Sequence, residues 1–319
     1  MQPALRTPRS ALLLTPGDPA GIGPEVALKA WVKLRRRYTL AFTGPEWVWR
    51  QTARRLGLPS PGSCMAVPAL KTVDEYSVRF GAMDPRGGTI AIECVREAAH
   101  ACMRGDAAAM VTAPLTKAGI HAAGYHYEGH TDFLAEVTGA RRHAMMLSSG
   151  PLRVLLVTIH QSLSSVPKGL TKVKILDKIV LADETGRRMG MKRPRIAVCG
   201  LNPHAGEAGA FGTEETRVIA PAIAAARRKG VLVSGPYPGD TVFCRAKDGE
   251  FDFVIAMYHD QGLIPVKLFG FDEGVNTTLG LPIVRTSPDH GTAYDKAGKG
   301  VASPSSMIAA IRMAASLAD

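Results

Sequence analysis

The chain has 319 residues with 46% hydrophobic side chains, a formal net charge of +11 and five cysteines. This length suits two lobes or one large α/β unit with a substantial core. No apolar stretch approaches the roughly 20 residues that span a bilayer, and the basic start leads into a short strand instead of a cleavable signal. The cysteines lack CxxC spacing, so we expect a cytoplasmic globular protein with reduced core thiols and no disulfide framework.

The positive charge leaves two interpretations open. Lys and Arg come in small groups spread along the chain, with no zinc-finger, RNP or heptad pattern. That distribution favours a solvated basic surface over a nucleic-acid-binding protein. Such a surface also attracts anionic small molecules, which a phosphate-handling enzyme would use.

Strands and helices alternate along the chain. Continuous apolar runs predict strands that are buried on both faces, at residues 11–17, 39–44, 107–114, 154–160, 195–202 and 253–259. Apolar residues at helical spacing predict helices at residues 89–104, 172–190, 214–230 and 305–318. The alternation predicts an α/β sheet with both faces covered.

A glycine-rich loop, GDPAGIGPE, follows the first predicted strand at residues 17–25. Pro24 stands where a helix favours proline, in the first turn. The loop resembles a phosphate-binding loop but has neither GxGxxG spacing nor the Lys-Ser/Thr pair of a P-loop. By itself it therefore gives only weak support for a nucleotide site.

The segment GHTD at residues 129–132 precedes another predicted helix. Thr131 or Asp132 could simply cap that helix. In the alternative interpretation, His130 and the free N–H groups of the helix start bind an anion.

Three of the apolar runs close on a histidine, at His160, His204 and His259. Each of them alone could cap its strand or satisfy a buried carbonyl. Because ligands collect outside the carboxyl ends of the strands in an open α/β sheet, three imidazoles there could also converge on one divalent metal. Their equivalent positions favour the metal site.

Farther along, Lys267, Asn276 and Arg285 lie in a segment with few other charges. Surface ion pairs would explain any one of them. As a group they suit a phosphate and a neighbouring carboxylate better.

Eight segments carry a family resemblance, and they occur in the order GDPAGIGPE, TAPLTK, GHTDFLAE, GLNPHAGE, FGTEE, AMYHDQGLIPVK, GVNTTLGLPIVRTSPDHGTA and AGKG. By these segments the chain resembles the 4-hydroxythreonine-4-phosphate dehydrogenase family of pyridoxal 5′-phosphate biosynthesis, over about residues 11–312. The resemblance implies an α/β, isocitrate/isopropylmalate dehydrogenase-like fold with two lobes and an active-site cleft between them. It places a coenzyme-binding lobe at 1–128 and 271–319 and a metal-binding and dimerisation lobe at 129–270.

The resemblance also implies the chemistry. The family oxidises 4-phosphooxy-L-threonine to 2-amino-3-oxo-4-phosphooxybutanoate with NAD or NADP, and the product loses CO₂ to give 3-amino-2-oxopropyl phosphate. One divalent metal per site, either Zn, Co, Mn or Mg, would lower the pKa of the substrate hydroxyl and so assist its oxidation. Members are homodimers, so we expect the metal site at or near a subunit interface.

Matched motif by motif, the resemblance implies roles for individual residues. The implied metal ligands are His160, His204 and His259. The implied substrate contacts are His130, Thr131, Lys267, Asn276 and Arg285. Asp240, Asp260 and Lys267 are candidates for the group that accepts the hydroxyl proton, and water on the metal is a fourth alternative.

Residues 289–300 resemble the adenosine-binding loop of isopropylmalate and isocitrate dehydrogenases. The implied coenzyme contacts are His290, Gly291, Thr292, Ala293, Asp295 and Lys296. A carboxylate at Asp295 would accept from ribose hydroxyls and repel a 2′-phosphate, whereas Lys296 acts in the opposite sense, so we expect NAD to be preferred and NADP to remain usable. The other interpretation is that both side chains point to solvent.

Two alternatives concern the function itself. Three histidines around a metal also describe a metal-dependent hydrolase or lyase, but such an enzyme has no use for an adenosine-binding loop. Gly239 before Asp240 and the pair Ala210-Phe211 depart from the common pattern of the family. Threonate or erythronate 4-phosphate and aromatic cis-dihydrodiols, which related enzymes oxidise, therefore stay open as substrates.

Overall fold

The computed structural model describes residues 10–318. The chain forms two compact units, which we call unit 1 (residues up to Arg141, together with Leu281–Ala318) and unit 2 (Arg142–Gly280). Within the described residues, no helix has the length and apolar character needed to cross a membrane.

The unit boundaries fall later in the chain than the predicted 128/129 and 270/271. Helix α5 (His130–Thr138) buries Phe133 and Leu134 in the same core cluster as α3 (Pro85–Met103), which assigns α5 to unit 1. Strand β10 (Val275–Leu279) pairs with β5 (Ala144–Ser149), which assigns β10 to unit 2. His130 and Thr131 therefore belong to unit 1 and Asn276 to unit 2.

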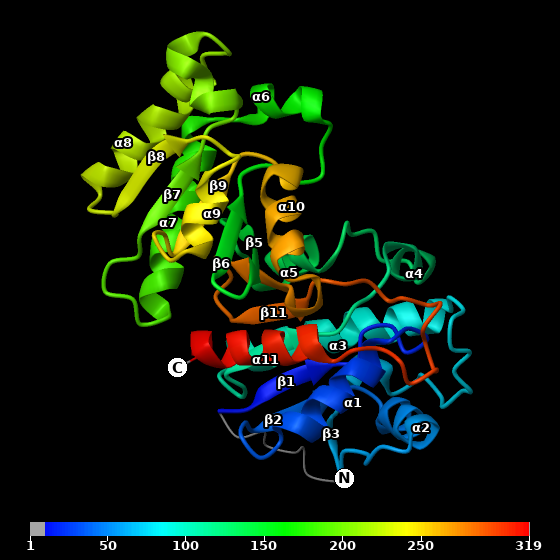
Figure 1. Ribbon diagram of the computed structural model, residues 1–319. Helices are drawn as coiled ribbons and strands as arrows, with labels where there is room; N and C mark the ends of the chain where they lie inside the picture. The colour runs from blue at the N-terminus through cyan, green and yellow to red at the C-terminus, as the bar shows by residue number, and fades with distance from the viewer. Residues whose placement is uncertain (1–9, 319) are drawn as a thin grey trace. The chain divides into compact units, whose positions relative to one another are not determined.

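Unit 1 is built on parallel strands in the order β3-β2-β1-β4-β11. These strands are Cys64–Met65, Leu40–Thr43, Leu12–Thr15, Ala109–Thr112 and Arg285–Pro288. Leu13 of β1 and Met110 of β4 pack with α3, and α11 (Ser305–Ala318) contacts β11 and β4. The other helices are α1 (Gly23–Leu34), α2 (Glu46–Leu56), α4 (Lys117–Ala122) and a short turn at Pro68–Leu70 (Figure 1).

Unit 2 has the strand order β10-β5-β6-β9-β7-β8. Strands β10, β5 and β6 (Leu152–Leu156) are antiparallel neighbours, whereas β6, β9 (Phe253–Ala256), β7 (Ile196–Cys199) and β8 (Val233–Tyr237) run parallel. Short helical turns complete the unit, at Leu163–Ser165, Val166–Gly169 (α6), Pro203–Gly209, Glu215–Ile219 and Phe271–Glu273.

Successive strand residues of unit 2 face opposite sides, as a pleated strand requires. Leu155, Val198 and Ile255 pack in one core cluster with helices α7 (Lys172–Arg188) and α8 (Ala220–Arg228). Val154, Ala197 and Val254 pack in another cluster with α9 (Val242–Lys247) and α10 (His259–Phe269). Figure 1 shows these two helix pairs on opposite faces of the strands, so both faces are covered as predicted.

The predicted strands and helices are all present, with small shifts at their ends. The helix predicted at 214–230 begins as a π-helical turn over Glu215–Ile219 before it continues as α8. The core-thiol prediction is wrong for Cys244, which is exposed. On α9 the buried face is taken by Val242, Phe243 and Ala246, so Cys244 faces away from the core.

Candidate active site

Three neighbouring parallel strands of unit 2 deliver the three predicted metal ligands to one edge of the sheet. Strand β9 lies between β6 and β7 and is parallel to both. His160 follows β6, His259 begins α10 just after β9, and His204 lies in the turn Pro203–Gly209 after β7. Because the carboxyl ends of parallel strands meet at the same edge, all three imidazoles lie on that side of unit 2.

Two of the three imidazoles come together within one chain. The ring centroids of His160 and His259 lie 5.9 Å apart, whereas the ring of His204 lies beside Phe211, at 6.1 Å. Over residues 10–318 of a single chain, no three His, Cys, Asp or Glu side chains are grouped closely enough to hold a metal ion. One chain therefore presents a histidine pair and a separate third histidine.

The imidazole of His259 is oriented by its neighbour. Its Nδ1 donates to Oδ1 of Asp260 at 2.7 Å. A carboxylate on one ring nitrogen holds the proton there and leaves the lone pair of Nε2 free for a metal. This arrangement fits the chemistry expected of a metal ligand.

The residues after His259 hold the helix start against the sheet. The Gln261 side chain accepts from the backbone N–H of Met257 and donates to the carbonyl of Gly200, both at 2.7 Å, and so links the ends of β9 and β7. A Cβ on Gly262 would stand 2.6 Å from Cδ2 of Leu156. Glycine there lets α10 lie directly on β6 and places His259 at the sheet edge.

The turn that carries His204 has an unusual backbone. His204, Ala205, Glu207 and Ala208 have φ values of 53°, 52°, 43° and 55°. Side chains with a Cβ rarely adopt this left-handed conformation, which costs free energy and persists only where surrounding contacts enforce it.

Glu215 supplies those contacts. Its buried carboxylate accepts from the backbone N–H groups of Leu201 and Asn202, each at 2.8 Å, and from the side-chain amide of Asn202 at 3.0 Å. Glu214 accepts from the same amide at 2.8 Å. Glu215 was missed as a site residue because it contacts backbone that precedes it by more than a helical turn.

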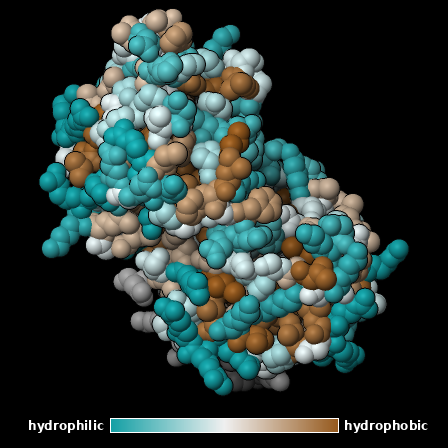
Figure 2. Space-filling model, viewed as in Figure 1, coloured by the Kyte–Doolittle hydropathy of each residue, from teal (hydrophilic) through white to brown (hydrophobic). Residues whose placement is uncertain are grey.

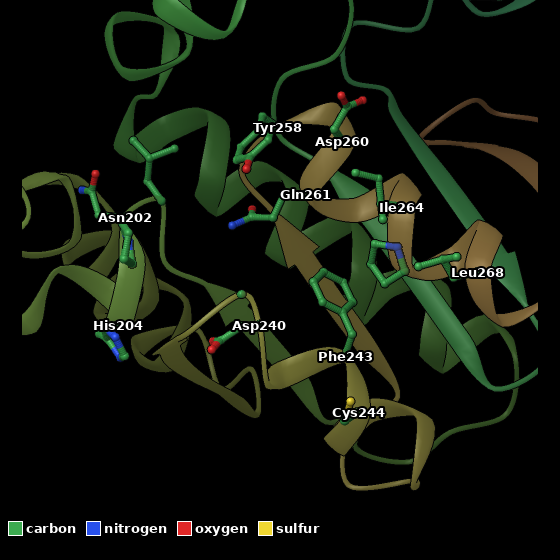
Figure 3. Close-up of a pocket in the computed structure, with 14 residues that line it drawn as sticks. Asn202, His204, Asp240, Phe243, Cys244, Tyr258, Asp260, Gln261, Ile264 and Leu268 are labelled. Atoms are coloured by element: carbon green, nitrogen blue, oxygen red, sulfur yellow. The ribbon is translucent and has the colours of Figure 1, made fainter.

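Two cavities open at this edge of unit 2. The larger, of about 610 Å³, is lined by His204, Asp240, Cys244 and Asp260 on its polar side and by apolar residues of α9 and α10 (Figure 3). The smaller, of about 250 Å³, is lined by His160, His259 and Asp260. Of the candidate proton acceptors, Asp240 and Asp260 line the larger cavity, whereas Lys267 is exposed on α10 and lines neither of these two.

Unit 1 holds a second cluster of predicted residues. Arg285 on β11 is buried, and its Nε and Nη2 donate to Oγ1 of Thr112 at 3.0 and 2.7 Å. Burial lowers the pKa of Arg285 to about 9. Burial and, secondly, the charge of Arg285 hold the pKa of His130 well below its ordinary range, so His130 is a neutral imidazole near a buried cation. A buried guanidinium beside a neutral imidazole offers donors that suit an anion.

The capping interpretation of the segment 129–132 is wrong. Helix α5 begins at His130 with Gly129 as its N-cap residue and no side-chain cap. Thr131 and Asp132 lie inside the first turn, where their side chains cannot serve as the N-cap.

Three of the predicted ligand-contacting residues carry a buried polar atom without a hydrogen-bond partner in the described part of the chain. These atoms are Nε2 of His130, Oδ1 of Asn276 and Nε2 of His290. Buried polar atoms are nearly always paired in folded proteins, so an unpaired one calls for an explanation. Five other buried side-chain atoms of the described residues, on Thr15, Glu25, His143, Arg153 and Thr277, also have no partner, so an unpaired atom does not by itself mark a ligand site.

The predicted coenzyme segment follows β11 in unit 1. Thr292 is buried, whereas Asp295 and Lys296 are exposed and accessible to a ligand. Nδ1 of His290 lies 3.0 Å from the carbonyl oxygen of Gly291, and Ala293 has a φ of 41°. The segment is irregular and depends on its neighbours for its conformation.

Comparisons with known proteins show which proteins this chain is similar to. The family model described as pyridoxal phosphate biosynthetic protein PdxA matches residues 35–314. A 4-hydroxythreonine-4-phosphate dehydrogenase from Geobacter metallireducens is 44% identical, with 96% of this chain and 95% of that protein covered. A putative D-threonate 4-phosphate dehydrogenase from Bradyrhizobium diazoefficiens is 42% identical, with 96% of each covered. The crystal structure of 4-hydroxythreonine-4-phosphate dehydrogenase from Klebsiella pneumoniae has a TM-score of 0.86 at 41% identity, covering 97% of this chain and 100% of that one. This likeness confirms the predicted dehydrogenase fold.

Removing the Glu215 carboxylate is expected to release the His204 turn. Glu215→Ala leaves the N–H groups of Leu201 and Asn202 without their acceptor, which should lower the free energy of unfolding by about 2–3 kcal/mol. Urea denaturation measures this change. Glu214→Ala is the matched control, since Glu214 bonds only the Asn202 amide among these groups, and should change stability by less than about 1 kcal/mol. Equal losses in the two variants would contradict the role given to Glu215.

Proposed function

Because the chain belongs to the PdxA family of pyridoxal phosphate biosynthetic proteins, we propose that it oxidises 4-phosphooxy-L-threonine with NAD(P) and a divalent metal. The product, 2-amino-3-oxo-4-phosphooxybutanoate, is a β-keto acid and decarboxylates to 3-amino-2-oxopropyl phosphate. The observation that carries the proposal is the His160–His259 pair at 5.9 Å, at the carboxyl edge of the parallel strands. We place the reaction in the cytoplasm, where the free thiols of this chain stay reduced.

His160, His204 and His259 would hold the metal. The carboxylate of Asp260 on Nδ1 of His259 fits that role, and neutral imidazoles suit Zn, Co, Mn or, more weakly, Mg. When bound, such a metal supplies Lewis acidity that makes the substrate hydroxyl easier to deprotonate. Asp240 and Asp260, which line the cavity beside His204, are the proposed proton acceptors.

The substrate contacts are divided between anion binding and orientation. Arg285 is a buried cation whose attraction for a phosphate or carboxylate is little screened by water. His130, held neutral, and Asn276 each offer a buried atom whose partner would be the substrate. Thr131 and Lys267 complete the proposed set, with hydroxyl and ammonium groups that suit phosphate oxygens.

A second substrate of the same class is D-threonate 4-phosphate. The Bradyrhizobium relative is named for it and is nearly as similar to this chain as the Geobacter relative. Both substrates present a phosphate, a hydroxyl to be oxidised and a carboxylate, so the same residues would bind either. NADH formation measured with each compound separates the two.

The proposed metal dependence predicts loss and recovery of activity. Chelation with EDTA should abolish turnover, and Zn²⁺, Co²⁺, Mn²⁺ or Mg²⁺ should restore it to different extents. His204→Ala should remain folded by circular dichroism and yet lose activity, because His204 is placed as a ligand and is not part of the buried core. Full activity of His204→Ala after exhaustive EDTA treatment would rule out the triad.

We propose further that the chain is a homodimer in which the two subunits share each metal site. A single chain groups only His160 with His259, so the third histidine would come from the partner. Ile264 and Leu268 on α10 are 56% and 83% exposed, and Figure 2 shows hydrophobic side chains along that helix, as expected of a subunit contact.

Mixing two inactive variants tests the sharing of sites. If His204 and His259 of one site come from different subunits, a mixture of His204→Ala and His259→Ala should regain about a quarter of wild-type activity, since random pairing gives half heterodimers with one intact site each. Sedimentation should show a dimer in both variants. No recovery in a mixture that does exchange subunits means that each chain builds its own site.

The exposed carboxylate of Asp295 is expected to set the coenzyme preference. It repels the 2′-phosphate of NADP, and about 1.4 kcal/mol of such repulsion gives about tenfold preference for NAD. Asp295→Ala should therefore lower the ratio of kcat/KM for NAD to that for NADP, and Lys296→Ala should raise it. An unchanged ratio in Asp295→Ala would show that Asp295 takes no part.

A further inference from the structure

The glycine-rich loop at residues 17–25 has no role in the function proposed so far. Its two carboxylates point inward, since Asp18 is 1% and Glu25 is 2% exposed. A phosphate cradle presents N–H groups and cations to its ligand, and buried carboxylates oppose an anion. The loop is therefore not used as the phosphate-binding loop that its glycines resemble.

Asp18 contacts the predicted coenzyme segment directly. Its Oδ2 accepts from the hydroxyl of Tyr294 at 2.5 Å, and its Oδ1 accepts from the backbone N–H of Ala20 at 2.9 Å. Tyr294 stands between Ala293 and Asp295, two of the residues expected to contact the coenzyme. The Asp18–Tyr294 bond therefore ties the middle of that segment to the first loop.

The two backbones also meet closely. The N–H of Ile22 donates to the carbonyl of Thr292 at 2.9 Å. A Cβ on Gly21 would lie 2.9 Å from both Cβ and O of Thr292, so only glycine permits this approach. The loop thus fixes the position of Thr292 as well as that of Tyr294.

Glu25 and Lys29 hold the far end of the same segment. Oε1 of Glu25 accepts from Nζ of Lys29 at 2.7 Å and from the N–H of Ala302 at 2.9 Å. Nζ of Lys29 also donates to the carbonyls of Gly300 and Ala302, both at 2.8 Å. All three protons of the ammonium group are used, and two of them bind the segment.

We propose that Asp18 and Glu25 are positioning residues of the coenzyme site, which clasp residues 292–302 at both ends in the conformation that binds the adenosine half of the coenzyme. The inference rests on the proposed function, in which residues 290–296 contact the coenzyme. An irregular segment whose geometry is set in advance loses less conformational entropy when it binds a ligand. The clasp should therefore act on coenzyme affinity and not on the chemical step.

Burying the Asp18 carboxylate costs free energy of folding. This cost distinguishes a residue that positions the coenzyme segment from one that only stabilises the fold. Burial raises the pKa of Asp18, which means that its charged form is disfavoured in the fold. Such a charge lowers the stability of the protein at neutral pH. Asp18→Asn should consequently keep or raise the melting temperature while it weakens coenzyme binding, a combination that a purely structural residue would not give.

Unit 1 contains a matched control for this interaction. The hydroxyl of Tyr125 donates to Oε1 of Glu93 at 2.8 Å, and Glu93 is 8% exposed. This is also a tyrosine–carboxylate bond at a buried acid, although Glu93 additionally accepts from Arg96, and it joins α3 to the segment before α5, outside residues 292–302. Tyr294→Phe and Tyr125→Phe remove the same chemical group from the two places.

The experiment measures the dissociation constant of NAD by titration calorimetry, together with kcat and the KM values, in wild type, Tyr294→Phe, Asp18→Asn and Tyr125→Phe. We expect the Kd and KM for NAD to rise about fivefold or more in Tyr294→Phe and Asp18→Asn, with kcat within about twofold and Tyr125→Phe unchanged. The double variant Asp18→Asn/Tyr294→Phe should be no weaker than the weaker single variant, because Asp18→Asn replaces the charged acceptor of the bond that Tyr294→Phe removes. Hydrogen exchange of residues 292–302 should accelerate in the same variants and in Glu25→Gln.

The outcomes separate this inference from the function on which it rests. If wild type binds NAD and the Tyr294→Phe affinity is unchanged, the clasp is wrong and the dehydrogenase assignment stands. If Tyr125→Phe weakens NAD binding as much as Tyr294→Phe, the effect is general and the clasp is also wrong. If wild type binds neither NAD nor NADP, the proposed function fails and the clasp fails with it. Should Asp18→Asn not fold, Tyr294→Phe still decides, because it leaves the carboxylate in place.

Discussion

Buried carboxylates that accept hydrogen bonds from irregular backbone shape both candidate ligand-binding regions of this chain. Glu215 accepts from two N–H groups and one amide of the segment before His204. In the segment that follows Thr292, Glu25 accepts from the N–H of Ala302 and Asp18 accepts from the side-chain hydroxyl of Tyr294. Irregular segments lack the ladder of a helix or sheet, so their N–H groups need another acceptor. A carboxylate with several lone pairs satisfies many donors at once, and the conformation of the segment then depends on one side chain.

The strands and helices of unit 2 place the histidines at one edge of the sheet, whereas the buried carboxylates hold the irregular segments in their conformation. Strands β6, β9 and β7 are adjacent and parallel, which brings the chain after each strand to the same edge. Gly262 lets α10 approach β6 closely, and Gln261 joins the ends of β9 and β7. His160 and His259 consequently lie close together at the ends of adjacent strands, whereas His204 is the first residue of a left-handed turn and its ring lies beside Phe211.

The strands that carry the histidines could be predicted because they are continuous apolar runs with both faces buried. The antiparallel strands β5 and β10 could not, since the polar residues of VNTTL give no such run and the strand exists through its pairing with β5. The predicted boundary at 270/271 differs from the observed one for the same reason, and the one at 128/129 differs because α5 packs with α3. The roles of Asp18 and Glu215 escaped prediction because the partner of a buried carboxylate is set by the fold, and Tyr294 lies 276 residues from Asp18. The sequence predicts that a histidine follows each of these strands, but it does not determine whether the three imidazoles lie close enough to bind one metal ion.

Burial acts on the charges of unit 1 in a way that favours a bound anion. It lowers the pKa of Arg285 to about 9 and holds the pKa of His130 below its ordinary range, because in both cases the charged form is poorly solvated. For His130 the unfolded chain binds the proton more readily, so protonation at falling pH works against the fold. Arg285 still carries its charge at neutral pH, because its lowered pKa of about 9 lies above 7. A phosphate or carboxylate near Arg285 would replace the lost solvation, so the same burial that weakens the free protein strengthens its attraction for an anionic ligand. Asp18 is under the same constraint, because burial raises its pKa although the hydrogen bonds from the Tyr294 hydroxyl and the Ala20 N–H act in the opposite direction.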